Sequence, residues 1–119
     1  HKNLSQVFGP STQPKENEID AFWDIINYKN GKRCFHRTIH YMNDRIENRE
    51  RWVNALINTE IPIRLVNGPM DPVSGAHMVE RYKELVPNPD CVLLDNIGHY
   101  PNVEAPYYVN LEVLKFFQE

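Results

Sequence analysis

Hydrophobic residues make up 41% of this 119-residue chain, which is enough to build the core of a small domain. The 13 Lys and Arg residues against 16 Asp and Glu residues give a formal net charge of -3, and this acidic balance argues against nucleic acid or an anionic membrane as the partner. We therefore expect the ligand to be a small, neutral or weakly charged molecule.

The two cysteines and the first residues of the chain indicate where in the cell the protein is expected. Cys34 and Cys91 lie far apart, without C-x-x-C or zinc-ligand spacing, as expected for isolated thiols of an intracellular protein. No apolar run approaches the roughly 18 residues that a membrane-spanning helix needs, and no signal-peptide pattern opens the chain. The first residue is His1 rather than Met, so we expect the chain to start inside a longer reading frame.

The first half of the chain has a helical pattern. Residues 1–17 are rich in proline, glycine and small polar side chains and are expected to form a loop. Over residues 18–28 the apolar positions recur at spacings of three and four, which is typical of an amphipathic helix, and Asn30-Gly31 is expected to end it. A longer helix is predicted over about 34–58. Its middle, residues 43–51, is almost wholly polar and is expected to be exposed or bent.

The pattern changes period in the second half. Residues 61–68, Ile-Pro-Ile-Arg-Leu-Val-Asn-Gly, are rich in branched side chains and closed by glycine, as in a buried strand. The elements expected after it are a helix over 74–86, a strand over 91–94, a loop over 96–101 and a helix over 107–117. Strands that alternate with helices in this way are parallel, so the predicted fold class is α/β. Because a parallel sheet is buried on both faces, we expect neighbouring strands from another part of the protein.

Two polar residues follow directly on the two expected strands. Asp71 lies in Gly-Pro-Met-Asp-Pro-Val, and His99 lies in Asn-Ile-Gly-His-Tyr-Pro. Ligands of open α/β sheets bind beyond the carboxyl ends of the strands, so both side chains are expected to reach one site. A carboxylate that accepts the Nδ1 proton of an imidazole leaves Nε2 free to take a proton from a nucleophile or a water. The pair therefore predicts the acid and the base of a catalytic triad.

Each of these residues alone has a structural alternative. An aspartate before a proline is more often a turn residue or a helix cap than a catalytic acid, and a single Gly-His-Tyr-Pro is equally weak evidence. Their common position after expected strands, with the acid before the histidine in the chain, favours the catalytic interpretation.

Residues 61–106 resemble the last third of the α/β-hydrolase fold. The resemblance is carried by the two motifs above and by the continuation Asn-Val-Glu-Ala-Pro after the histidine. It points to the group that holds haloalkane dehalogenases, epoxide hydrolases and mesoderm-specific transcript proteins, and similarity to the last of these extends through residues 8–12 and 49–56. The resemblance implies that Asp71 is the triad acid and His99 the triad histidine. It also implies structural roles for Glu104 and Pro106.

The resemblance further implies a division of the chain. Residues 1–57 would form a helical cap, or lid, with its return helix, and residues 58–119 would form the C-terminal part of the α/β-hydrolase core. Aromatic side chains of such a cap line the substrate cleft, although aromatic residues at helical spacing also serve simply as packing residues. Cap tyrosines of epoxide hydrolases polarise the epoxide oxygen, which makes Tyr41 a candidate for that role. The candidates for contact with substrate are Trp23, Tyr28, Tyr41, Trp52 and Tyr100.

The chain departs from the family's pattern at the nucleophile. The elbow G-x-S-x-G, or its aspartate variant, is absent from the 119 residues, and so is the upstream loop that donates an oxyanion-hole amide. Ser5 and Ser11 lie in the leading loop and Ser74 lies near the acid, so none of the three is a credible nucleophile. A triad without its nucleophile loses most of its rate, so the isolated chain is expected to be inactive.

No cofactor or metal is expected. His36 and His40 are four residues apart and could share one helix face, but no carboxylate completes an H-E-x-x-H pattern. Surface histidines are the stronger interpretation.

Two functions from different classes stay open. The first is an enzyme: joined to the N-terminal half of the fold as its partner, the chain would serve a hydrolase of small ester, epoxide or halide substrates with a serine or aspartate nucleophile. The alternative is a hydrolase-fold protein that binds a ligand or partner without turnover. The expected location is intracellular, either in the cytoplasm or, as the mesoderm-specific transcript group implies, at the endoplasmic reticulum membrane through an anchor outside this chain.

Overall fold

The computed structural model describes residues 2–118, and the chain divides into two compact units. The first unit combines the segment up to Pro14 with everything from Glu60 onward, and the second unit is Lys15–Thr59. The division into a cap over residues 1–57 and a core part over residues 58–119 stays a prediction, but residues up to Pro14 group with the C-terminal part of the chain. The reason is a set of contacts between this segment and the loop of His99, described below.

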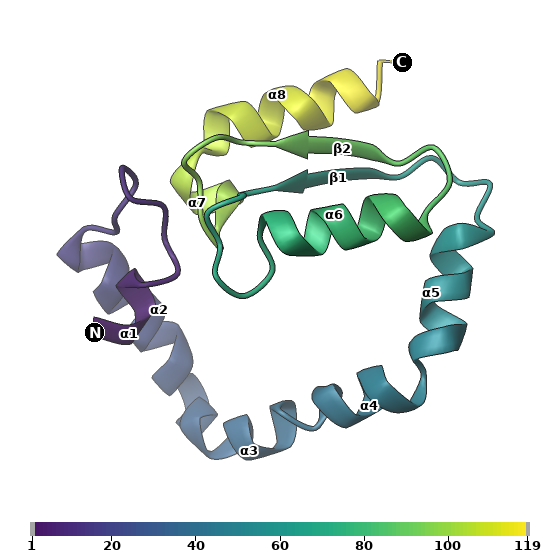
Figure 1. The fold of residues 1–119 in the computed structure, drawn as a ribbon. Coiled ribbons are helices and arrows are strands. Elements are labelled where there is room, and N and C mark those ends of the chain that lie inside the picture. The colour runs from purple at the N-terminus through teal and green to yellow at the C-terminus, as the bar shows by residue number, and fades with distance from the viewer. Residues whose placement is uncertain (1, 119) are drawn as a thin grey trace. The chain divides into compact units, whose positions relative to one another are not determined.

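The first unit is built on two parallel strands (Figure 1). β1 (Arg64–Asn67) pairs with β2 (Asp90–Leu93) in a register that aligns Arg64 with Asp90 and Asn67 with Leu93. The predicted strands and their parallel direction are confirmed. β1 begins later than predicted, in keeping with Pro62, which has no backbone N–H to give to a ladder.

A helix lies on either side of the two strands (Figure 1). α6 (Ala76–Leu85) connects β1 to β2 and contributes Val79, which is 1% exposed, to the core. α8 (Pro106–Phe116) follows β2 and is held to β1 through Arg64. The Arg64 guanidinium lies 2.8 Å from the Asp90 carboxylate, donates to the carbonyl oxygen of Glu112 at 3.3 Å, and lies over the ring of Phe116. Both helices are close to their predicted ranges.

Two short helices of the first unit are not predicted by the sequence. α1 (Lys2–Ser5) precedes the buried ring of Phe8, whose centroid lies 5.2 Å from the ring centroid of Tyr100. α7 (Pro101–Glu104) follows the histidine loop and begins at a proline, a residue suited to the first turn of a helix. A helix of four residues is too short to show an apolar period, so neither has a sequence signal of that kind.

The second unit consists of helices that follow one another in the chain. α2 (Glu16–Asn27) agrees with the first predicted helix, and its Glu18 carboxylate accepts a hydrogen bond from the backbone N–H of Lys15 at 2.7 Å. The later elements are the 3₁₀ segment η1 (Tyr28–Cys34), α3 (Phe35–Thr38), α4 (Tyr41–Glu47) and α5 (Arg49–Ile57). Within η1, Lys29 and Asn30 have positive φ angles of 47° and 64°.

The single long helix predicted over 34–58 is wrong in its continuity. Three separate helices occupy this range, and Asn48 separates the last two with φ -103° and ψ 11°. The Asn48 side-chain amide donates to the carbonyl oxygen of Asp44 at 3.0 Å, a local bond that competes with helical pairing. The bend expected in the polar stretch 43–51 is therefore present.

Few apolar side chains are buried in the described part of the chain. Those below one-tenth exposure are Phe8, Val79, Ile97 and Ala105. Large apolar residues on the first unit stay exposed, among them Ile61 at 74% and Phe117 at 81%. Across residues 2–118, no helix combines the length and the apolar character that crossing a bilayer requires.

Candidate catalytic site

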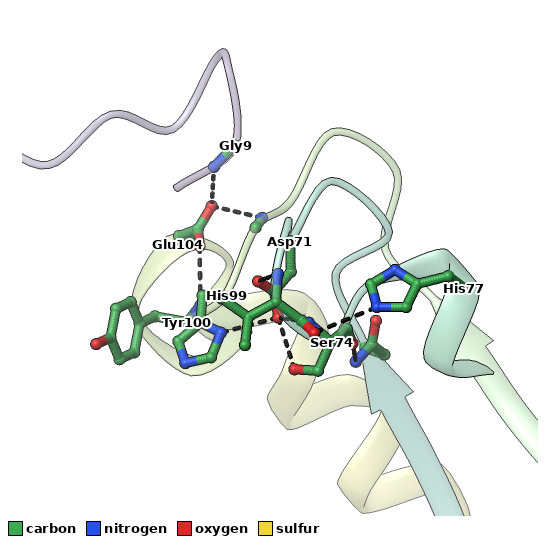
Figure 2. A network of polar contacts seen from close by, with 10 residues as sticks. Gly9, Asp71, Ser74, His77, His99, Tyr100 and Glu104 are labelled. Carbon is green, nitrogen blue, oxygen red and sulfur yellow. Dashed lines mark hydrogen bonds and ion pairs between the residues drawn. The ribbon is translucent and has the colours of Figure 1, made fainter. Parts of the chain in front are cut away.

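Two loops leave the sheet at the carboxyl ends of β1 and β2, and they bring Asp71 and His99 together (Figure 2). Because the strands are parallel, both loops begin at the same edge of the sheet. Backbone hydrogen bonds join the loops directly: the N–H of Met70 donates to the carbonyl oxygen of Ile97 at 3.0 Å. The two side chains, 28 residues apart in the chain, thus start from a common backbone frame.

The Asp71 carboxylate is buried, at 5% exposure, and is surrounded by donors. Oδ1 accepts a hydrogen bond from the backbone N–H of Val73 at 2.8 Å. Oδ2 accepts bonds from the backbone N–H of Ser74 at 3.0 Å and from its hydroxyl at 2.7 Å. The same Oδ2 lies 2.8 Å from Nδ1 of His99. Asp71 therefore closes the turn that follows it and also contacts the histidine.

These contacts fix the protonation of Asp71. Burial by itself would raise the pKa of this carboxyl group, but the hydrogen bonds from Val73, Ser74 and His99 outweigh burial and lower the pKa below its ordinary value of 3.8. Asp71 is thus an ionised carboxylate at neutral pH and can only accept hydrogen bonds. It follows that Nδ1 of His99 carries the proton in the contact between them.

The remaining nitrogen of His99 is the one available for chemistry. The side chain is 34% exposed, and Nε2 has no hydrogen-bond partner among residues 2–118. The ring meets the ring of Tyr100 edge-on, with centroids 4.9 Å apart, and the backbone N–H of His99 donates to the carbonyl oxygen of Val7 at 2.8 Å. With the proton on Nδ1, the lone pair of Nε2 can accept a proton from a hydroxyl or a water.

Glu104 joins the N-terminal segment to the loop that carries His99 (Figure 2). Its Oε2 accepts bonds from the backbone N–H of Gly9 and of Gly98, both at 2.8 Å, and from the Thr12 hydroxyl at 2.5 Å. Its Oε1 accepts a bond from the backbone N–H of Tyr100 at 3.0 Å. Burial acts to raise the pKa of Glu104, but these donors prevail and lower it below 4.5.

Glycines allow these segments to approach. A Cβ on Gly98 would lie 2.3 Å from the carbonyl oxygen of Val7, and a Cβ on Gly68 would lie 2.1 Å from that of Gly98. Both distances are far inside van der Waals contact, and the atoms concerned are backbone atoms that cannot rotate away. The glycine before the histidine therefore serves close packing with the N-terminal segment.

Comparison with known proteins identifies relatives of this chain. The mesoderm-specific transcript protein of Mus musculus is 36% identical over 107 residues, which are 88% of this chain and 32% of that protein. The homolog protein of Homo sapiens is 37% identical over the same shares. The chain is a relative of the mesoderm-specific transcript proteins. The resemblance inferred from the sequence is thereby confirmed.

The protein named "Putative hydrolase LipZ" from Mycobacterium tuberculosis is a further relative, 33% identical over 105 residues, which are 88% of this chain and 36% of that protein. The chain spans about a third of the length of the curated relatives it matches. No family model matches the chain, and no solved structure matches it significantly.

The candidate substrate-contacting residues divide between the units. Tyr100 lies beside His99 in the first unit, with its ring also near Phe8. The other candidates belong to the second unit and are all exposed, between 40% and 69%: Trp23, Tyr28, Tyr41 and Trp52. The contact of these five side chains with substrate stays a prediction.

The described residues hold no group of three His, Cys, Asp or Glu side chains arranged to bind a metal ion. His36 lies in α3, whereas His40 lies between α3 and α4. Cys34 is exposed and Cys91 half-buried, and both are free thiols.

Sequence reasoning missed the contacts that support the candidate site, although the family resemblance implied a structural role for Glu104. Ser74 was considered only as a nucleophile, although Asp-Pro-Val-Ser is a pattern in which the aspartate accepts bonds from residues two and three positions on. The hydrogen bonds of Glu104 with Gly9 and Thr12 join residues more than 90 positions apart in the sequence, and no local pattern could have indicated them.

Proposed function

We propose that this chain is the C-terminal part of an α/β-hydrolase and that it supplies the acid and the histidine of the catalytic triad. The observation that carries the proposal is the 2.8 Å contact between Asp71 Oδ2 and His99 Nδ1 beyond the carboxyl ends of two parallel strands. A relative whose name contains "hydrolase" supports the same class. The nucleophile would come from a part of the fold that precedes these residues.

With a serine nucleophile, His99 would act first as a base. Nε2 would take the hydroxyl proton while the serine oxygen attacks the carbonyl carbon of an ester, and the imidazolium would be stabilised by the Asp71 carboxylate. His99 would then give this proton to the departing alkoxide, leaving an acyl-enzyme. A water would then give a proton to Nε2 as it attacks the acyl group, and collapse of the tetrahedral species would release the acid while Nε2 returns the proton to the serine oxygen.

With an aspartate nucleophile, His99 would act only in the second step. The aspartate oxygen would displace a halide, or would open an epoxide whose oxygen takes a proton from the candidate donor Tyr41, forming an ester with the enzyme. Nε2 would then take a proton from a water that attacks this ester, releasing the alcohol product. Both routes demand the same property of this chain: a neutral imidazole with its lone pair on Nε2.

The second unit, residues 15–59, is proposed to be the cap over the site. Its aromatic residues Trp23, Tyr28, Tyr41 and Trp52 would contact the substrate, and Tyr41 is the candidate donor to an epoxide oxygen. Small esters, epoxides and haloalkanes are the substrate classes that this arrangement suits.

Substitution of the pair in the full-length protein tests the proposal. Asp71→Asn would place an amide N–H against Nδ1 and favour the proton on Nε2, so kcat for hydrolysis should fall about 10⁴-fold. His99→Ala should have an effect of similar size. The assay is steady-state kinetics with p-nitrophenyl esters, styrene oxide and a bromoalkane.

A matched histidine serves as the control. His77 is exposed, and its ring contacts the carbonyl oxygen of Val73 at 3.2 Å without touching Asp71 or His99, so His77→Ala should keep full activity. Activity that survives both Asp71→Asn and His99→Ala would refute the triad assignment. A wild-type protein that binds these compounds without turning any of them over would instead support a non-catalytic, ligand-binding member of the fold.

A further inference from the structure

Positive charge is concentrated in one part of the acidic chain. Residues 25–43, here called the basic segment, contain four Lys and Arg residues and no Asp or Glu. The whole segment lies within the second unit. The chain as a whole has a net charge of -3, which argues against anionic partners. This sum includes the acidic residues outside the segment and therefore does not reveal its positive charge.

The cations of the basic segment have no carboxylate partners. Lys29, Lys32, Arg33 and Arg37 are all exposed. None of them forms an ion pair with any residue in the described part of the chain. The ammonium groups of Lys29 and Lys32 lie 5.3 Å and 5.0 Å from the ring centroids of Tyr28 and Trp23.

A cavity of about 420 Å³ opens within this segment. It is lined by Asn27, Asn30, Lys32 and Arg33. Two cations and two carboxamides can donate many hydrogen bonds, and no carboxylate lines the cavity to repel an anion. Arginine and lysine donors of this kind suit phosphate oxygens.

Apolar side chains of the same segment are exposed alongside these cations. Ile25 is 73% exposed, Ile39 60% and Phe35 53%. A free phosphate would use only the cations and amides, whereas a membrane surface offers both phosphate groups and an apolar layer directly beneath them. Exposed apolar side chains combined with unpaired Lys and Arg are typical of segments that lie in the membrane interface.

We infer that residues 25–43 bind the surface of an anionic phospholipid bilayer. A headgroup phosphate occupies the cavity beside Lys32 and Arg33, and apolar residues such as Ile25 and Phe35 enter the boundary between headgroups and acyl chains. This inference does not depend on the catalytic roles proposed for Asp71 and His99.

Vesicle flotation of the full-length protein tests the inference. Wild-type protein should float with phosphatidylcholine vesicles that contain phosphatidylserine and should not float with phosphatidylcholine alone. Each Lys or Arg near an anionic surface contributes about fivefold to binding, so Lys32→Ala/Arg33→Ala should weaken binding about 30-fold. Added sodium chloride should weaken wild-type binding in the same direction.

The matched control removes the same charge elsewhere in the second unit. Arg49 and Arg51 are exposed on α5, where Glu47 and Glu50 are close in sequence. Arg49→Ala/Arg51→Ala should therefore float like the wild type. Circular dichroism of each variant establishes that it is folded, and the comparison of the two vesicle types with wild-type protein decides the question without any variant.

Three results would overturn the inference. One is equal flotation with both vesicle types, which would show apolar adsorption only. Another is an equal loss in both double variants, which would make net charge the cause. The third is flotation of Lys32→Ala/Arg33→Ala at the wild-type level, which would show that the cations of the cavity take no part in binding.

Discussion

Asp71 makes the contacts expected for both of the roles that its sequence context left as alternatives. Its carboxylate closes the turn over Val73 and Ser74, as an aspartate beside prolines commonly does, and it also contacts His99. The turn bonds hold the carboxylate in one orientation before any charge develops on the imidazole. A structural role of the aspartate therefore supports the proposed catalytic one, because a fixed carboxylate needs no reorganisation when an imidazolium forms.

The Ser74 hydroxyl is the donor of this set that a mutation can remove most cleanly. Ser74→Ala deletes the 2.7 Å bond to Oδ2 and leaves the backbone N–H of residue 74 in place. A donor that favours the ionised form is lost, so the pKa of Asp71 should rise toward its ordinary value. The free energy of unfolding at pH 7 should fall by about 1 to 2 kcal/mol. Carboxyl carbon NMR titration and urea denaturation of the full-length protein measure the two effects.

The sign of the pH effect follows from the lowered pKa of Asp71. Its stabilising contribution is complete above the ordinary value of 3.8 and is lost as the pH falls through the lower value of the folded state. Ser74→Ala should therefore reduce the stabilising contribution of Asp71 at neutral pH. It should also narrow the range of acidic pH over which this contribution is lost, because the two pKa values move closer together. Ser11→Ala is the control, because Ser11 is exposed in its loop. An unchanged pKa of Asp71 in Ser74→Ala would contradict the role given to this hydroxyl.

At the residue scale, the sequence was sufficient to predict the contact between Asp71 and His99 but not its supports. The motif that ends each strand shows which polar residue follows it, and the carboxyl ends of parallel strands bring such residues to the same edge of the sheet. The donors around Glu104 are backbone N–H groups of Gly9, Gly98 and Tyr100. Every residue except proline has such a group, so residue identity does not reveal which of them point at one carboxylate.

At the scale of elements, Glu104 at the end of α7 connects two loops, the one that contains Gly9 and the one that contains His99. One carboxylate oxygen contacts both Gly9 and Gly98, and the other contacts Tyr100. The segment before Pro14 thereby becomes part of the first unit. Because His99 lies between Gly98 and Tyr100, the position of its backbone depends on this carboxylate.

Glu104→Gln keeps the size of the side chain and removes its charge. The amide N–H₂ of glutamine would face N–H donors, so at least one bond is lost and the loss of stability should be about 2 to 3 kcal/mol at pH 7. The pKa of Glu104 is lowered, so its contribution exists above about 4.5 and disappears as the pH falls through the folded-state value. The difference in stability between Glu104→Gln and wild type should therefore shrink as the solution becomes more acidic.

Urea denaturation of the full-length protein at a series of pH values measures this difference. Glu80→Gln, an exposed change of the same kind on α6, should leave the profile unchanged. A Glu104→Gln penalty that stays constant from neutral pH to below the folded-state pKa would show that shape rather than charge holds the loops.

The elements differ in how well the sequence predicts them, for physical reasons. α6 and α8 show the apolar spacing of a helix, whereas β1 and β2 lie in short runs rich in apolar side chains, and the sequence predicts all four elements in order. The segment 34–58 shows a broken apolar stripe, and it forms separate helices because the polar stretch around Asn48 offers no packing surface to a continuous one. The proline that starts α7 was an available signal, because proline favours the first turn of a helix.

At the scale of the whole molecule, the first unit has a small core and exposed apolar faces. Val79 and Ile97 are buried, whereas Leu114 and Phe117 of the C-terminal region are 58% and 81% exposed. A two-stranded parallel sheet with one helix on either side normally continues into further strands. Together with relatives about three times as long as the matched region, these faces support the proposal that the chain completes its fold with other residues.

The 119-residue chain by itself is expected to lack enzyme activity. Ser74 donates its hydroxyl to Asp71, so it is not positioned to be activated by Nε2 of His99, and Ser11 lies in an exposed loop. The purified chain should therefore hydrolyse p-nitrophenyl acetate no faster than free imidazole at the same concentration, and Asp71→Asn should not change that rate. The full-length protein should exceed it by several orders of magnitude. Saturable turnover by the isolated chain that His99→Ala abolishes would mean that these residues contain their own nucleophile.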